Sequence, residues 1–274
     1  MQKNETSRGA RESGKTVEKG QLMEERRRLI RELVETEEQV TVEQLSSRFG
    51  TSVVTIRSDL KALEEIGAIV RTHGGALMQR DGDDLPISVK ENHHQAEKKR
   101  IAIAAVKLIQ DGDTIILDSG TTTAEIAKLI RGMRLRSINV ITNALNVAVL
   151  LANVPHVNLI MLGGWLRSKS YSLSGPQAVA ALSHLQADRL FLGIDSLDPE
   201  IGLMTPHPLE AELNAQMIQV SSQVVAVADS SKLLRRNLSV IARVEELDLL
   251  ISDRAADAGV VAALGQRGVK VVLV

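Results

Sequence analysis

The sequence predicts an α/β protein of two domains, an N-terminal winged helix-turn-helix domain and a C-terminal domain built on a mainly parallel sheet. Two observations support this fold class. Residues 21–78 show three short apolar patterns at helical spacing and then a Gly-Gly hairpin. Residues 96–274 show apolar strands that alternate with amphipathic helices, a pattern typical of a parallel sheet covered on both faces.

Two further segments have no such periodicity. Residues 1–20 are polar and rich in Gly, Ser, Lys and Glu, so we expect a disordered tail. Residues 79–95 contain Asp81-Gly82-Asp83-Asp84 and Pro86, which favour loops. We therefore expect an interdomain linker over residues 79–95.

The composition excludes several classes of protein. The 274 residues include no Cys, which excludes disulfide scaffolds, Cys-ligated zinc and iron–sulfur clusters. The 33 Lys and Arg are balanced by 34 Asp and Glu, which excludes a uniformly basic surface for nucleic acid. Because there are only one Trp, one Tyr and two Phe, stacking on the bases of single strands is not expected either.

No motif indicates a metal, a cofactor or a membrane. The six His residues lack metal-ligand spacing, and neither a P-loop nor a G-x-G-x-x-G motif occurs. No apolar run reaches the roughly 18 residues of a membrane span, and the N-terminus lacks the apolar stretch of a signal peptide. We expect a cytoplasmic protein that binds no metal and no cofactor and does not associate with membranes.

Three helices are expected in the N-terminal domain. The first begins near Leu22, where apolar residues start to recur at helical spacing. The second runs from an N-cap at Thr41 to Phe49. Gly50 then supplies a turn, and the third helix begins near Ser52. Two short helices joined by a tight turn with Gly are typical of the helix-turn-helix motif.

The outer face of the third helix is suited to DNA. Its hydroxyls and long cations can bind phosphate oxygens and base edges in a major groove. A strand, turn and returning strand over residues 68–77 add a wing. The candidate DNA-binding residues are Thr51, Ser52, Thr55, Arg57, Ser58 and Lys61 on the helix, with Arg71 and His73 on the wing. The alternative is a polar helix face on an ordinary three-helix domain.

The stretch from Arg28 to Leu77 resembles the DNA-binding domain of the DeoR family of bacterial transcriptional regulators. The resemblance rests on Thr55-Ile56-Arg57-x-Asp59-Leu60 and on Arg71-x-x-Gly74-Gly75-Ala76. It implies that the third helix reads double-stranded operator DNA and that the wing lies along the backbone. Because acids and bases are nearly equal in this domain, one copy should bind weakly, and we expect a homo-oligomer, either a dimer or a tetramer.

Seven apolar strands are expected in the C-terminal domain. They lie at residues 114–117, 140–142, 157–162, 190–193, 224–227, 249–251 and 271–273. Helices are expected between most of them, at residues 96–110, 144–152, 177–185 and 209–220 and after Gly120. Such alternation predicts one parallel sheet.

The stretch Asp118-Ser119-Gly120-Thr121-Thr122-Thr123 joins the first of these strands to a helix. Backbone N–H groups at a helix N-terminus, with hydroxyls beside them, can bind a phosphate. Ligands also bind at the carboxyl ends of parallel strands. The alternative is a capped turn between strand and helix with no ligand.

Other polar residues follow neighbouring strands or lie on a later helix. They should converge with the first turn on one cleft, because the carboxyl ends of parallel strands lie on one edge. These further ligand-binding candidates are Thr142, Asn143, Gly163, Gly164, Arg167, Asp195, Glu210, Asn214 and Lys232.

These motifs resemble the effector domain of the DeoR family, which is similar to ribose-5-phosphate isomerase and binds phosphorylated sugars. The resemblance implies a DNA-binding repressor of a sugar catabolic operon, with an amino sugar as one candidate, that a phosphorylated sugar releases from its operator. The alternative is an isomerase-like enzyme with an accessory DNA-binding domain, in which Asp118, Asp195, Glu210 and Lys232 would supply acid–base groups. A binding module without DNA affinity is a third hypothesis.

Overall fold

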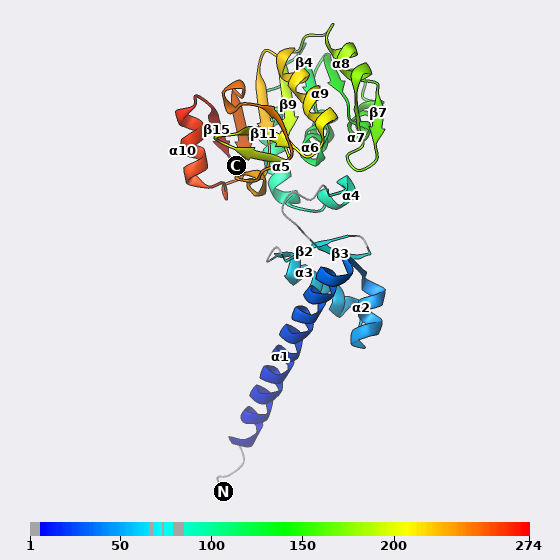
Figure 1. Ribbon diagram of the computed structural model, residues 1–274, viewed down its shortest axis with the longest axis vertical. Coiled ribbons are helices and arrows are strands. Elements are labelled where there is room, and N and C mark those ends of the chain that lie inside the picture. Colours follow the sequence, from blue (N-terminus) through cyan, green and yellow to red (C-terminus); the bar gives the residue numbers. More distant parts are fainter. Residues whose placement is uncertain (1–5, 66–67, 73, 79–84) are drawn as a thin grey trace. The chain divides into compact units, whose positions relative to one another are not determined.

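The computed structural model describes residues 6–65, 68–72, 74–78 and 85–274. The chain divides into two compact units, Met1–Asp83 and Asp84–Val274 (Figure 1). Each unit is a domain with a hydrophobic core of its own. The division lies inside the segment in which we expected a linker.

The N-terminal domain is a winged helix-turn-helix, as predicted. Its helices are α1 (Thr6–Glu37), α2 (Val42–Phe49) and α3 (Val53–Glu65), and its strands are β1 (Gln39–Thr41), β2 (Ile69–Arg71) and β3 (Gly75–Met78). The three strands form an antiparallel sheet in the order β1-β3-β2. The predicted hairpin is β2 and β3, and β1 was not expected.

Local chemistry explains how α2 begins and ends. The Thr41 hydroxyl accepts a hydrogen bond from the Gln44 amide at 3.1 Å, and the Gln44 side chain accepts one from the Thr41 amide at 2.7 Å. This reciprocal capping box satisfies N–H groups that the first helical turn leaves free. Gly50 ends the helix. Leu45, Ile56 and other apolar residues of the three helices form the buried core.

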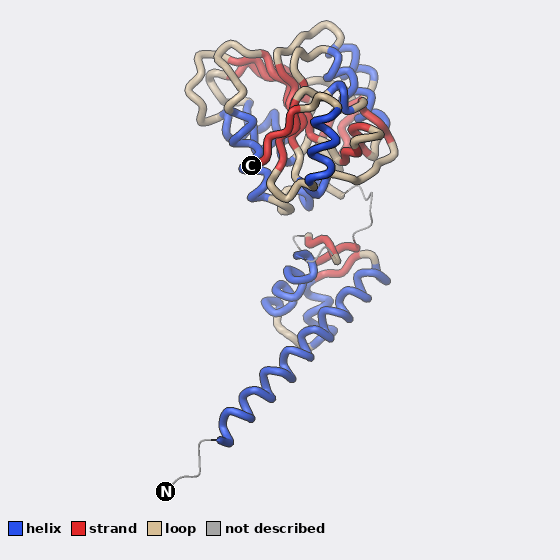
Figure 2. Tube along the Cα trace, turned by 90° about the vertical axis from the view of Figure 1, so that its left-hand side faces the viewer, coloured by secondary structure: helices blue, strands red, loops and turns tan. Residues whose placement is uncertain are grey.

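Helix α1 is longer than the sequence predicts. It begins at Thr6, so residues 6–20 are helical where we expected a disordered tail. The segment has no Pro and is rich in Glu, Lys and Arg, which are good helix formers. Its glycines, Gly9, Gly14 and Gly20, weaken a helix far less than Pro would, so the helix continues into the amphipathic part. The N-terminal half of α1 extends away from α2 and α3 (Figure 2).

The C-terminal domain is built on a seven-stranded parallel sheet in the order β15-β14-β12-β9-β4-β5-β6. All seven predicted strands are present. They are β4 (Thr114–Leu117), β5 (Ile138–Thr142), β6 (Val157–Met161), β9 (Arg189–Gly193), β12 (Val224–Val227), β14 (Leu249–Ser252) and β15 (Lys270–Leu273). Each predicted helix is also present, with small differences at its ends.

The helices form two layers, one on each face of the sheet. One layer contains α5 (Gln95–Val106), α6 (Thr121–Ile130) and α7 (Leu145–Leu151), and the other contains α8 (Pro176–Leu182), α9 (Pro208–Gln219) and α10 (Ala258–Gln266). Successive residues of a strand point to opposite faces. On β9, Phe191 packs in the core on the side of α5, α6 and α7. Its neighbours Leu190 and Leu192 pack in the core on the side of α8, α9 and α10.

Short antiparallel strands were not predicted. One sheet has the order β10-β11-β13, from β10 (Ser196–Asp198), β11 (Gly202–Thr205) and β13 (Ser239–Ala242). A hairpin pairs β7 (Trp165–Arg167) with β8 (Ser172–Ser174). Strands of three or four residues give almost no periodic signal, so the sequence does not distinguish them from loops.

The expected linker is shorter than predicted. Residues 85–95 belong to the C-terminal domain, where α4 (Ile87–Lys90) packs its buried Ile87 and Val89. A helix of four residues is too short to show a 3.6-residue period, which is why the sequence favoured a loop. Residues 79–84 lie outside the described part of the chain.

Phe191 should be a main determinant of the stability of the C-terminal domain, because its side chain is fully buried in the central strand. We expect Phe191→Ala to lower the free energy of unfolding by about 3–5 kcal/mol. Urea unfolding followed by far-UV circular dichroism measures this. The matched control is Val240→Ala at an exposed strand position, where a loss as large as that of Phe191→Ala would contradict the assignment.

Candidate functional site

A cavity lies at the carboxyl edge of the parallel sheet. Strands β4, β9 and β12 end at it, and α4, α9 and the loop between β7 and β8 complete its walls. Nine of the predicted ligand-binding residues line it, namely Asp118, Ser119, Gly120, Thr121, Thr122, Arg167, Asp195, Glu210 and Asn214. The predicted convergence of strand ends therefore holds for these nine positions.

The turn between β4 and α6 forms one wall of the cavity. Ser119, Gly120, Thr121 and Thr122 all line it, and α6 begins at Thr121. The backbone N–H groups of a first helical turn have no partner inside the helix. Hydroxyls and these N–H groups thus occur together at the cavity, and an anion is the ligand that this arrangement favours.

Gly193 allows β9 to pass close to this turn. A Cβ atom at this position would lie 2.7 Å from the Ser119 carbonyl oxygen. That separation is far below van der Waals contact, so any larger residue would displace the turn. The glycine at the end of β9 is thus part of the packing that positions Ser119.

Asp118 is a buried acid at the cavity. Its Oδ2 accepts a hydrogen bond from Asn214 Nδ2 at 2.9 Å, and Oδ1 has no hydrogen-bond partner among the described residues. Burial raises the pKa of Asp118 to about 8, with the nearby carboxylates Glu210 and Asp195 adding to the increase. At neutral pH the side chain is therefore mostly protonated and can donate a hydrogen bond to an oxygen of a ligand.

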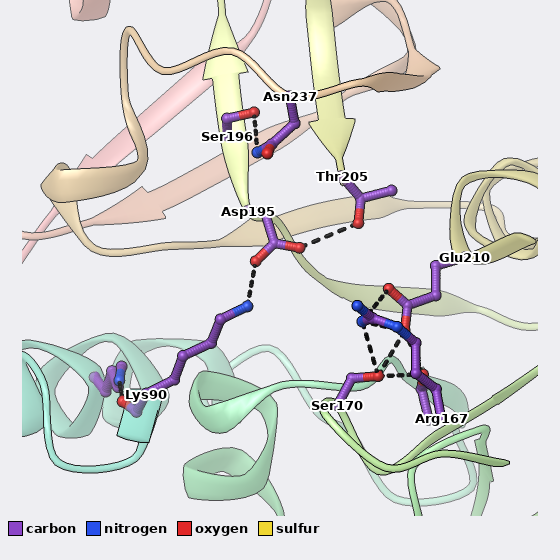
Figure 3. A network of polar contacts seen from close by, with 10 residues as sticks. Lys90, Arg167, Ser170, Asp195, Ser196, Thr205, Glu210 and Asn237 are labelled. Carbon is purple, nitrogen blue, oxygen red and sulfur yellow. Dashed lines mark hydrogen bonds and ion pairs between the residues drawn. The ribbon is translucent and has the colours of Figure 1, made fainter. Parts of the chain in front are cut away.

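Glu210 of α9 is the centre of a group of polar contacts at the cavity (Figure 3). Ser170 Oγ donates to Glu210 Oε1 at 2.7 Å, and the Ser172 hydroxyl donates to the same oxygen. The Arg167 guanidinium forms an ion pair with Glu210 at 3.4 Å. The carboxylate is thus satisfied inside the protein, and Arg167 and Ser170 are held at the cavity surface.

Asp195 is the acceptor in a second network, also shown in Figure 3. Lys90 Nζ lies 2.8 Å from Asp195 Oδ1, and Thr205 Oγ1 donates to Oδ2 at 3.1 Å. Burial raises the pKa of Asp195, but Lys90, Lys232 and the hydrogen bond from Thr205 outweigh burial and leave the pKa below its usual value. Asp195 is therefore an anion at neutral pH, unlike Asp118.

Six predicted ligand-binding residues do not line the cavity. Thr123 is buried and donates to the Gly120 carbonyl at 3.1 Å, and Thr142 donates to the Leu117 carbonyl at 2.7 Å. Asn143 is fully buried beside β8. Lys232 lies in a short 3-10 helix, where burial lowers its pKa although Asp229 and Asp195 oppose that change.

Of the two glycines Gly163 and Gly164, the second is required by the fold. Gly164 has a φ of 116°, and a Cβ atom there would lie 2.4 Å from the Ser174 carbonyl oxygen. The position thus requires Gly both for its backbone conformation and for the close approach of β8. Neither glycine lines the cavity.

Several cavity residues were not among the predicted ligand-binding residues. Lys90 and Lys169 line it, as does Thr205. Lys98 is a buried lysine behind α4, and burial lowers its pKa to about 8. Lys90 was not predicted because it lies in the segment that we expected to be a linker. Its position at the cavity depends on α4, which is too short to show a helical period. A basic residue that follows an apolar pair in an otherwise polar segment is the one available clue.

The candidate DNA-binding face lies on α3. Arg57, Ser58 and Lys61 are exposed on it. Ser52 is exposed as well, but its hydroxyl accepts a hydrogen bond from the Thr55 amide at 3.1 Å and so caps the start of the helix. Thr51 is partly buried.

Several other charged residues of the N-terminal domain form ion pairs. On the wing, Arg71 forms an ion pair with Glu64 at 3.5 Å, and His73 lies outside the described residues. Asp59 does not interrupt the outer face of α3. It is buried and binds Arg26 at 2.6 Å and Arg27 at 3.0 Å. These two arginines join α1 to α3 and do not belong to a solvated face.

Two kinds of feature are absent from the described part of the chain. Its side chains form no cluster of three or more His, Asp or Glu that could hold a metal ion. Among the helices described, none combines the length and the apolar character needed to cross a membrane.

Comparison with known proteins agrees with both domains. Residues 26–81 match the DeoR-like helix-turn-helix domain, and residues 93–254 match the DeoR C terminal sensor domain. The chain belongs to the DeoR family. It is a transcriptional regulator with a helix-turn-helix DNA-binding domain and a sensor domain, and not an enzyme.

Relatives of this DeoR-family chain span nearly its whole length. The putative aga operon transcriptional repressor of Escherichia coli O157:H7 is 40% identical over 91% of this chain and 93% of the relative. The HTH-type transcriptional regulator GlpR of Haloferax volcanii is 38% identical over 92% and 98%. Among solved structures, ribose 5-phosphate isomerase from Plasmodium falciparum is similar with a TM-score of 0.38 and 18% identity, over 52% of this chain and 54% of that one.

The protonated Asp118 should make the stability of the sensor domain depend on pH. In the unfolded chain this carboxyl loses its proton near pH 4, whereas the folded protein keeps it up to about pH 8. The stability that the bound proton contributes is therefore present at low pH and is lost as the pH rises through that window. The loss is at most about 1.4 kcal/mol per pH unit.

Asp118→Asn should remove this dependence, because the amide stays neutral and can still accept the hydrogen bond from Asn214. Urea unfolding at pH 5, 6.5 and 8 should show the variant gaining stability relative to the wild type as the pH rises. Asp257→Asn is the matched control, at an exposed N-cap that Asn can also fill. Parallel pH curves for the wild type and Asp118→Asn would show that the acid is ionised in the folded protein.

Proposed function

We propose that the chain is a transcriptional repressor of a sugar catabolic operon and that a phosphorylated sugar, with an amino sugar phosphate as one candidate, releases it from its operator. The observation that carries this proposal is the cavity at the carboxyl edge of the sheet, where a helix N-terminus, hydroxyls, cations, acids and amides occur together. One side of such a cavity suits a phosphate, and the other suits hydroxyl groups. Because the same chain has a DNA-binding domain, ligand binding can regulate its affinity for operator DNA.

The phosphate would bind at the turn that begins α6. Ser119, Thr121 and Thr122 offer hydroxyls there, beside the free N–H groups of the first helical turn. The helix dipole adds a partial positive charge. Arg167 and Lys169 also line the cavity and would balance the remaining negative charge.

The sugar would bind among the acids and amides. Asp195 is ionised and can accept hydrogen bonds from hydroxyls, whereas protonated Asp118 can donate one to a ring or carbonyl oxygen. Asn214 can do both. A mixture of donors and acceptors suits a polyhydroxylated ligand, because buried polar groups select the ligand that satisfies them all.

Operator DNA would bind at α3, with Arg57, Ser58 and Lys61 facing the major groove. The nearly balanced charge of the chain gives one copy little affinity for DNA, so a dimer or tetramer would supply it through several half-sites. The regulator would act in the cytoplasm, where the operator DNA is.

A thermal-shift screen tests the ligand part of the proposal. The panel contains galactosamine 6-phosphate, ribose 5-phosphate and glycerol 3-phosphate, each beside its unphosphorylated form, and inorganic phosphate. A ligand at about 100 times its Kd should stabilise the protein by about 2.7 kcal/mol. Stabilisation by an unphosphorylated sugar alone would contradict the phosphate assignment.

Arg57→Ala tests the DNA-binding face. If Arg57 reads a guanine edge, its loss should weaken operator binding by about 1–3 kcal/mol and relax specificity at one base pair. Gel shifts at fixed salt, with DNA from upstream of the protein's own gene and with single-base operator variants, measure both effects. Arg100→Ala, an exposed arginine of α5 in the sensor domain, is the matched control. Equal losses in the two variants would show that Arg57 acts only through net charge.

Thr122→Asp tests the phosphate site. A carboxylate about 4 Å from the ligand phosphate costs about 4 kcal/mol at an effective dielectric constant near 20. The α6 dipole favours an acid in the first turn, so the protein should fold and bind operator normally. We expect a super-repressor that galactosamine 6-phosphate no longer releases. Ser183→Asp, at an exposed hydroxyl after α8, is the control, and normal release of Thr122→Asp would remove Thr122 from the site.

A further inference from the structure

Helix α4 forms a wall of the cavity although it lies next to the segment that joins the two domains. Ile87 and Lys90 of α4 line the cavity. The Ile87 amide donates to the Lys169 carbonyl at 2.6 Å, which ties the start of α4 to the loop between β7 and β8. Asp84 marks the beginning of the C-terminal unit, so only two residues separate this boundary from α4.

The end of α4 is held by charged groups. Lys90 Nζ forms an ion pair with Asp195 Oδ1 at 2.8 Å, and its side chain reaches from α4 towards Asp195, just before β10 (Figure 3). Lys98, a buried residue of α5, donates a hydrogen bond to the Lys90 carbonyl. The ion pair therefore joins a four-residue helix to the carboxyl edge of the sheet, and both of its residues line the cavity.

The enclosed part of the cavity is narrow. Its volume is about 80 Å³, whereas pockets for small molecules measure about 300–1,000 Å³. The backbone of the turn before α6 is fixed by the sheet, and Glu210 is enclosed by three donors. The Lys90 side chain has four rotatable carbons and can move without a change in the backbone.

Asp195 is also the anion that, in the proposed function, accepts hydrogen bonds from the hydroxyl groups of the sugar. Its two oxygens accept hydrogen bonds from Lys90 and from Thr205, and Lys90 lines the same cavity, so a ligand hydroxyl that approaches Asp195 from the cavity meets the Lys90 ammonium group. Thr205 lies on β11, inside an antiparallel sheet. Lys90 is the donor that can be displaced at lower cost, because its side chain is partly exposed at 25% and can return to water.

We propose that Lys90 is a latch, in which a ligand hydroxyl replaces its ammonium group at Asp195 and thereby releases α4 from the sheet. The inference rests on the proposed function, because it assigns the hydroxyl end of the phosphorylated sugar to Asp195. It also proposes how ligand binding affects the DNA-binding domain. Helix α4 directly follows the interdomain segment in the chain, so its release would loosen the point at which the sensor domain begins. Lys90 acts as a competitor of the ligand, and not as a phosphate ligand.

Lys90→Met tests the latch, because it keeps a long apolar side chain and removes the ammonium group. Galactosamine 6-phosphate should bind the variant about 5-fold or more tightly than it binds the wild type, since no ion pair has to be broken. Inorganic phosphate, which fills only the turn before α6, should bind both proteins equally. Lys99→Met, at an exposed lysine of α5, is the control and should match the wild type with both probes.

Operator titrations give the second readout. The ratio of operator affinities without and with saturating galactosamine 6-phosphate should be smaller in Lys90→Met than in the wild type, because part of the release has already occurred. Weaker binding of inorganic phosphate to Lys90→Met would make Lys90 a phosphate ligand and overturn the latch. Unchanged sugar-phosphate affinity, or an unchanged ratio, would overturn it as well.

Hydrogen exchange separates the latch from the proposed function. Amides of residues 87–91 should exchange faster in Lys90→Met than in the wild type and in Lys99→Met, with no ligand present. Equal exchange would show that the ion pair does not hold α4 and would overturn the latch whatever the ligand. If no member of the sugar-phosphate panel binds the wild type, the proposed function fails, and the exchange comparison still decides whether Lys90 holds α4.

Discussion

The common direction of the seven strands is the constraint on which the site depends. Because β15, β14, β12, β9, β4, β5 and β6 are all parallel, their carboxyl ends lie on one edge, and each loop that leaves a strand must start there. The central strands β4 and β9 therefore present Asp118 and Asp195 to the same cavity, although 77 positions separate them in the chain. The two helical layers pack against alternate residues of the strands. Residues within the strands therefore form the core, and residues just after the strands are left to form the site.

Charges at this edge are balanced in three different ways. Asp118 is kept neutral by burial, Glu210 is enclosed by hydroxyls and Arg167, and Asp195 remains ionised beside Lys90 and Lys232. Burying an unpaired charge costs several kcal/mol. The domain can hold these three acids close together because each is either neutral or bound by donors and cations. The same arrangement leaves one donor, one shielded anion and one accessible anion within a single cavity.

The sequence was sufficient for the sheet and for the main turn but not for the details that close the cavity. Apolar strands with regular spacing are strong signals, and all seven parallel strands were predicted. By contrast, α4 and the antiparallel strands are too short to show a period. Thr142 and Gly164 look like ligand-binding residues in sequence because hydroxyls and glycines at strand ends serve both binding and packing. Only the distances to Leu117 and Ser174 identify them as structural.

The shared carboxylate of Asp59 joins two helices of the N-terminal domain. Arg26 and Arg27 hold it from α1, and Asp59 itself belongs to α3. Two guanidinium groups on one buried anion, beside the packed side chains of Ile30 and Leu60, join the two helices by charge as well as by apolar packing. Helix α1, which begins well before this contact at Thr6, is thus anchored to the helix that carries the candidate DNA-binding face.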